Sequence, residues 1–169
     1  MNPETGPFEI ERKYLIKYPD IRLLESMPNC RKVAITQIYL TGRDGECRRI
    51  RQWSEDGQDL YFKTLKRDVT DVTRIEIEEP LSREEYLALI READPTRFPI
   101  RKTRYCLTYD NQCFEIDVYP FWQDRATMEI ELRAEDDEIR FPPQVEIIRE
   151  VTEDRNYRNS ALAKNGGKF

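Results

Sequence analysis

The sequence predicts an α+β domain built on an antiparallel β-sheet or barrel. Eight segments alternate between apolar and polar residues, as strands do, whereas only three short stretches have a helical pattern. Turn residues separate several of these strands, and Glu55-Asp56-Gly57 and Tyr109-Asp110-Asn111 predict hairpins. The strands are expected over about 8–17, 33–41, 46–53, 59–66, 72–79, 100–109, 112–120 and 126–134.

The expected helices are short and lie between or after the strands. They are placed near 20–27, 82–94 and 155–164. Ser82, followed three residues later by Glu85, has the pattern of a capping box, in which each side chain binds the other residue's backbone N–H. The start of the second helix is therefore well defined by the sequence.

Length and charge indicate one domain without a broad basic surface for nucleic acid. The chain has 169 residues, enough for a single domain with a substantial core. We expect this domain over 8–164, with a flexible N-terminal segment at 1–7 and a flexible C-terminal end at 165–169. Because 33 acidic residues outnumber 28 basic ones, a broad basic surface is disfavoured and no DNA partner is expected.

Histidine is absent, which restricts the chemistry of any active site. Ser-His-Asp and Cys-His mechanisms and imidazole metal sites are excluded. An enzyme built from this chain has to use carboxylates, Lys, Arg and Tyr, together with a hard cation. The sequence has four cysteines and no Cys-x-x-Cys pair, so we expect reduced thiols and a cytoplasmic protein. No apolar run approaches the ~20 residues of a transmembrane helix, so no membrane partner is expected.

The first expected strand carries a charged face. Side chains alternate along a strand, so Glu9, Glu11 and Lys13 point one way while Phe8 and Ile10 point the other. Two carboxylates are ligands for a divalent metal ion, and a neighbouring ammonium group can bind phosphate.

Five later strands repeat this charged alternation, with both signs of charge. One interpretation is an ordinary half-exposed sheet, with charges in water. The other is a closed barrel whose polar faces line a solvated tunnel, where opposite charges neutralise one another. The pattern by itself leaves both open. The charged positions are Arg49 and Arg51; Arg74, Glu76 and Glu78; Lys102 and Arg104; Glu115 and Asp117; and Glu129 and Glu131.

The ordered series of these motifs resembles the CYTH family, also called triphosphate tunnel metalloenzymes. The resemblance covers nearly all of 8–164 and implies an eight-stranded antiparallel barrel that forms a charged tunnel, with flanking helices. It further implies that the tunnel binds a triphosphate with Mg²⁺ or Mn²⁺ and hydrolyses a phosphoanhydride bond. The series comprises Glu9-Ile10-Glu11-Arg12-Lys13, Tyr39-Leu40, Arg49-Ile50-Arg51, Tyr61-Phe62-Lys63-Thr64-Leu65-Lys66, Arg74-Ile75-Glu76-Ile77-Glu78, Lys102-Thr103-Arg104-Tyr105, Phe114-Glu115-Ile116-Asp117-Val118, Glu129-Ile130-Glu131-Leu132 and Glu150-Val151-Thr152-Glu153-Asp154.

The resemblance also implies roles for individual residues. The metal ligands would be Glu9, Glu11, Asp117, Glu129 and Glu131. The phosphate-binding cations would be Lys13, Arg49, Arg51, Lys66, Arg74, Lys102 and Arg104. Supporting carboxylates would be Glu76, Glu78 and Glu115, and the residues closest to the chemistry Glu9, Glu11, Lys13 and Lys102. A second metal, a carboxylate or a Lys of lowered pKa could activate the attacking water, and the sequence does not choose among them.

Inorganic triphosphate is the substrate expected first, because it needs only the tunnel charges. The alternatives are a nucleotide or thiamine triphosphatase, a class IV-like adenylyl cyclase, and a sensor that binds triphosphate or polyphosphate without turnover. Cys47 stands where animal thiamine triphosphatases carry an aromatic residue, which disfavours thiamine. Trp53 and Trp122 would either stack on a base or cover the core, and an exposed flank with Trp122 would allow a homodimer.

Overall fold

The computed structural model describes residues 8–168, so the expected flexible segment at 1–7 and Phe169 lie outside the described residues. All eight predicted strands are present, and one further strand was not predicted. The strands are β1 (Phe8–Lys17), β2 (Cys30–Leu40), β3 (Cys47–Glu55), β4 (Gln58–Asp68), β5 (Thr73–Leu81), β6 (Ile100–Tyr109), β7 (Gln112–Val118), β8 (Arg125–Leu132) and β9 (Ile147–Glu150). The helices are α1 (Ile21–Ser26), α2 (Arg83–Leu89) and α3 (Asn159–Asn165), with 3₁₀ turns η1 (Ile90–Glu92) and η2 (Arg155–Tyr157).

The first eight strands form a closed antiparallel barrel, as predicted. Their order around the sheet is β5-β4-β3-β2-β6-β7-β8-β1, and β1 pairs with β5 over 8–10 to close the ring. β9 adds to the edge of β1 over 14–16, beyond the short contact with β5. β9 was not predicted, because it has four residues and no clear alternation of apolar and polar side chains.

Both predicted hairpins have the backbone of a type I′ turn. The φ angles are 49° at Asp56 and 76° at Gly57, and 48° at Asp110 and 60° at Asn111. A type I′ turn needs positive φ at both central residues, a conformation that Gly, Asn and Asp tolerate best. These turns fix the register of β3 with β4 and of β6 with β7.

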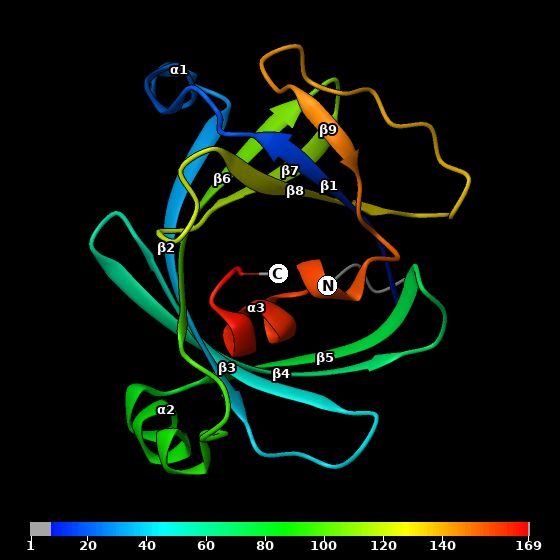
Figure 1. Cartoon of the computed structure of the whole chain (residues 1–169). Coiled ribbons are helices and arrows are strands. Elements are labelled where there is room, and N and C mark those ends of the chain that lie inside the picture. The colour runs from blue at the N-terminus through cyan, green and yellow to red at the C-terminus, as the bar shows by residue number, and fades with distance from the viewer. Residues whose placement is uncertain (1–7, 169) are drawn as a thin grey trace.

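Most of the hydrophobic core lies outside the barrel wall. Along β1, β6, β7 and β8 most of the apolar side chains point outward, where Leu24 of α1 and the loop 133–146 cover them. On the opposite flank, Tyr86 of α2 covers Leu40 and Ile50. Figure 1 shows α1 and α2 on the outside of the ring of strands. Ser82 and Glu85 make both hydrogen bonds of the predicted capping box at the start of α2.

A third apolar cluster closes one end of the barrel. It joins inward-facing residues such as Leu15 and Tyr119 to Leu162 of α3, which lies across the ring in Figure 1. Trp122 is only 7% exposed, and its indole N–H donates to the carbonyl of Gly167 at 3.0 Å. Trp122 therefore covers the core instead of offering the exposed flank that we considered for a homodimer. The C-terminal end that we expected to be flexible holds these contacts as far as the structure describes it.

The charged faces point into the barrel, so the interpretation as a half-exposed sheet is wrong. Lys63, on the face opposite to Lys66, pairs with Glu79 on the outside at 3.0 Å, as its position in the strand predicts. Among the helices of residues 8–168, none combines the length and apolar character needed to cross a membrane.

If the stabilising core lies outside the barrel wall, an outward-facing aromatic residue should matter for stability. Phe114 on β7 has no exposed surface, and Phe114→Ala should lower the free energy of unfolding by about 3–5 kcal/mol because it leaves a cavity. Phe98, which is 66% exposed, provides the matched control, and Phe98→Ala should change stability little. Urea denaturation measures both, and equal losses would contradict this location of the core.

Candidate functional site

A cavity of about 470 Å³ runs through the barrel interior. Its wall carries more acidic than basic side chains, all but a few of them on strands. The acidic residues are Glu9, Glu11, Glu46, Asp68, Glu76, Glu78, Glu115, Glu129 and Glu131. The basic residues are Lys13, Arg49, Arg51, Lys66, Arg74, Arg104 and Arg158. A polyanion therefore meets net negative charge here unless a cation enters with it.

The carboxylates of β1 and β8 are held by cations from neighbouring strands. Lys13 and Glu129 are direct partners across β1 and β8, and Lys13 Nζ lies 2.8 Å from Glu129 Oε1. Arg74 of β5 contacts Glu11 at 3.2 Å. Glu131 lines the same cavity but is exposed at its mouth. The pairing of β1 with β8 thus places the two Glu pairs side by side, as the resemblance implied.

Lys66 of β4 joins three of the carboxylates. Its Nζ lies 3.1 Å from Glu9, 3.2 Å from Glu76 and 3.9 Å from Glu11. Burial raises the pKa of Glu9 to about 9, against the opposing effect of Lys66, and Glu9 also shares a hydrogen bond with Glu76. Lys66 holds the pKa of Glu76 low in spite of burial. Glu9 and Glu76 together therefore retain one proton near neutral pH, which indicates that this part of the cavity is short of positive charge.

The arginines of β3 line the wall with incompletely used hydrogen-bond donors. Arg51 pairs with Glu78, which also accepts a hydrogen bond from Thr64 at 3.2 Å. Arg49 is 8% exposed and takes part in no ion pair within residues 8–168. The Nε atoms of Arg49 and Arg51 are buried without a hydrogen-bond partner among the described residues. Because buried donors are normally satisfied, these groups fit an anionic ligand in the cavity.

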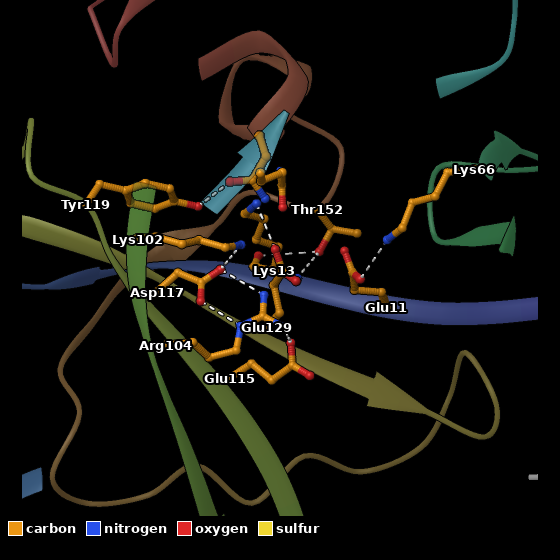
Figure 2. A network of polar contacts seen from close by, with 12 residues as sticks. Glu11, Lys13, Lys66, Lys102, Arg104, Glu115, Asp117, Tyr119, Glu129 and Thr152 are labelled. Carbon is orange, nitrogen blue, oxygen red and sulfur yellow. Dashed lines mark hydrogen bonds and ion pairs between the residues drawn. The ribbon is translucent and has the colours of Figure 1, made fainter. Parts of the chain in front are cut away.

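Lys102, Arg104 and Asp117 form a compact buried cluster, and Figure 2 shows the contacts among them. Asp117 accepts a hydrogen bond from Lys102 at 2.6 Å and two from Arg104, at 2.8 and 2.9 Å. Arg104 also pairs with Glu115. Burial lowers the pKa of Lys102 to about 7, and the positive charge of Arg104 adds to this effect while Asp117 opposes it.

The positions of Lys102 and Asp117 differ from the expectation. Their side chains are 1% and 0% exposed, and neither lines the cavity. We predicted Asp117 as a metal ligand, but both of its oxygens are engaged by Lys102 and Arg104 in this structure. We predicted direct phosphate binding and a catalytic role for Lys102, whose amine instead faces Asp117. Sequence alternation gives the face of a residue correctly but not which side chains stand in front of it.

Every other predicted site residue lines the cavity, together with several that the sequence analysis did not assign. Tyr39, on β2, lies beside Arg49 of the neighbouring strand β3. Thr152 and Arg158 come from the segment that follows β9. The order of motifs included Thr152, but no charge pattern identified a role for it.

The donor set fits a hard divalent cation. Glu9, Glu11, Glu129 and Glu131 offer only oxygen atoms, which Mg²⁺ and Mn²⁺ prefer. The pKa of Glu131 is raised by partial loss of hydration in the cavity and by the carboxylates of Glu76 and Glu11, so an added cation would relieve repulsion. Within the part of the chain that is described, no three acidic, Cys or His side chains already have the spacing of a metal site. Lys13, Lys66 and Arg74 contact Glu129, Glu9 and Glu11 in this structure.

Comparisons with known proteins agree with the geometry. The family model for the CYTH domain matches residues 7–157. The chain is 35% identical to an inorganic triphosphatase from Nitrosomonas europaea, over 92% of this chain and 96% of that protein. The crystal structure of the inorganic triphosphatase NE1496 has a TM-score of 0.56 at 31% identity, covering 92% of this chain and 94% of the other. The PH1819 protein from Pyrococcus horikoshii OT3 has a TM-score of 0.57 at 21% identity, covering 76% and 80%, and shares the fold.

Proposed function

Because the chain belongs to the CYTH family, we propose that it is a metal-dependent enzyme that hydrolyses inorganic triphosphate. The observation that carries this proposal is the closed barrel interior, where Glu pairs of β1 and β8 face Arg and Lys side chains of β3 and β4. The relative from Nitrosomonas europaea, an inorganic triphosphatase, supports the choice of substrate.

The cations of the wall bind and orient the phosphate groups. Arg49 and Arg51 lie on one strand with unused buried donors, and a planar guanidinium can hold two phosphate oxygens at once. Lys13 and Lys66 add compact charges from β1 and β4. A triphosphate held at several points is kept in line for attack by water, which is the main contribution a protein makes to phosphoryl transfer.

Glu9, Glu11, Glu129 and Glu131 would hold the metal ion, which we take to be Mg²⁺ or Mn²⁺. When bound, the ion supplies Lewis-acid stabilisation of the negative charge on phosphate oxygens. Glu76, Glu78 and Glu115 would support the cations of the wall, because they pair with Lys66, Arg51 and Arg104.

Asp117 and Lys102 act through Arg104. Asp117 holds the Arg104 guanidinium by two hydrogen bonds, so that its remaining donors face Glu115 and the cavity. The Lys102 amine donates a third hydrogen bond to the Asp117 carboxylate. Direct proton transfer by Lys102 would require its amine to leave Asp117, whereas its effect on Arg104 needs no movement.

One observation favours a second candidate substrate. Trp53 lines the cavity at the end opposite to α3, where an indole ring could stack on a base or a thiazolium ring. A nucleotide or thiamine triphosphate would use this surface, but inorganic triphosphate would not. Binding of triphosphate without turnover and adenylyl cyclase chemistry stay as alternatives, which the phosphate-release assay below also tests. Cytoplasmic location stays a prediction.

The decisive experiment is a phosphate-release assay with Mg²⁺ and, separately, Mn²⁺. Inorganic triphosphate, ATP and thiamine triphosphate are compared side by side, and cyclic AMP is measured in the ATP reaction. We expect the highest kcat/KM for inorganic triphosphate and no cyclic AMP. Tight binding of triphosphate without phosphate release would replace the enzyme by a sensor, and a preference for ATP or thiamine triphosphate would shift the function to the Trp53 surface.

Removing one metal-binding carboxylate should stop turnover without disturbing the fold. Glu11→Gln keeps the size and removes the charge, so metal-dependent phosphate release should fall by about 100-fold or more. Titration with Mg²⁺, together with circular dichroism, measures activity and fold in parallel. Glu84→Gln, on the exposed first turn of α2, is the matched control. Normal Mg²⁺ dependence in Glu11→Gln would contradict the metal assignment.

Arg49 should contribute more to substrate binding than an outward-facing cation does. A charged hydrogen bond is worth about 1.5–3 kcal/mol, so Arg49→Ala should lower kcat/KM for triphosphate by roughly 10- to 100-fold. Lys63→Ala removes a charge that pairs with Glu79 on the outer face and should leave kcat/KM unchanged. Steady-state kinetics on both variants decides, and an equal effect would remove Arg49 from the phosphate-binding wall.

A further inference from the structure

β1 lacks a neighbouring strand along part of one edge, next to the proposed active site. β8 pairs with the other edge continuously over 10–17. On the open edge β5 reaches only 8–10, and β9 begins its pairing at 14–16. The N–H of Glu11 still donates to the carbonyl of Val72, just before β5, at 3.0 Å. Residues 12–13, which include the proposed site residue Lys13, therefore lie in a gap in the ladder.

A side chain occupies the place of the missing strand at Lys13. The backbone N–H of Lys13 donates to Oγ1 of Thr152 at 3.0 Å, and this hydroxyl donates to Oε1 of Glu150 at 2.9 Å. The N–H of Val151 donates to the carbonyl of Lys13 at 2.8 Å. The two main-chain groups of Lys13 on this edge are thus satisfied by the segment after β9, with Thr152 in the role of a strand carbonyl (Figure 2).

Thr152 also belongs to the wall between two cavities. It is 7% exposed and lines the central cavity together with Lys13. A second cavity is lined by Arg12, Val72, Arg149, Glu150 and residues 152–155. Among these described residues, Thr152 is the one that also lines the central cavity. A buried N–H without an acceptor is costly, so loss of the hydroxyl would leave β1 free to shift at this point.

We propose that Thr152 is a positioning residue for Lys13. It fixes the backbone of β1 in the gap between β5 and β9, and so sets where the Lys13 amine stands against Glu129, 2.8 Å away. The effect on catalysis rests on the proposed triphosphatase function, whereas the effect on β1 does not. The two parts can therefore be tested separately.

The test compares Thr152→Val, which keeps the shape and loses the acceptor, with Thr152→Ser, which keeps the hydroxyl. Thr36→Val, on the outer face of β2, is the matched control. Amide hydrogen exchange followed by NMR reports on Lys13 and Ile16 of the same strand. In Thr152→Val, exchange at Lys13 should accelerate by about tenfold or more, while Ile16, whose N–H faces β8 opposite Ala126, should keep its protection. In the same variant kcat for triphosphate hydrolysis should fall by about tenfold, and Thr152→Ser should restore both values.

Unchanged exchange at Lys13 in Thr152→Val would overturn the proposal, as would accelerated exchange in Thr152→Ser that matches the Val variant. Equal acceleration at Lys13 and Ile16 would show a general loss of stability and would also overturn it. If Thr152→Val does not fold, Thr152→Ala replaces it in the comparison. Normal protection of the Lys13 amide in Thr152→Ser and loss of that protection in Thr152→Ala would support the role of the hydroxyl, and any other result would contradict it. If the wild-type protein releases no phosphate, the proposed function fails while the exchange result still decides the role of Thr152.

Discussion

Confinement of opposite charges inside a closed barrel is the constraint on which the rest of this structure depends. An ion removed from water is stable only when partners of opposite charge and hydrogen bonds replace the water. Here Lys66 pairs with three carboxylates, and Asp117 pairs with two cations. Since the interior is given to charges, the apolar residues have to be buried elsewhere. They are buried on the outer faces, under α1, α2 and the loop 133–146, and at the end closed by α3.

The same constraint explains why so much could be predicted from the sequence. Alternation of charged and apolar residues in β1, β3, β5 and β8 gives the inward face of each strand, and positive-φ residues such as Gly57 and Asn111 give the hairpins. These are local signals. Closure of the barrel is not local, because a half-exposed sheet has the same alternation, and the resemblance to a known family decided between the two.

The features that the sequence did not predict depend on contacts between distant segments. β9 is too short to have a period, and its pairing with β1 is visible only in three dimensions. Asp117 lies on the predicted face, but Lys102 and Arg104 of the adjacent strand enclose it. Thr152 is an uncharged residue in a turn, and nothing in its neighbourhood along the chain shows that it binds the backbone of Lys13. Residue type and spacing predict which side of the wall a group occupies, and only packing determines which groups reach the cavity.

The pairing of β1 has a consequence for how the protein acquires its activity. Glu11 and Glu131 are direct neighbours across β1 and β8, yet they lie near opposite ends of the domain in the chain. A nascent polypeptide that has emerged only as far as β7 has neither the second carboxylate pair nor the segment that supports Lys13. The proposed site can therefore form only after β1 has paired with β8, which is distant in the sequence. Pairings between distant segments form slowly. Fragments truncated before β8 are expected to be inert, so incomplete chains would not deplete triphosphate.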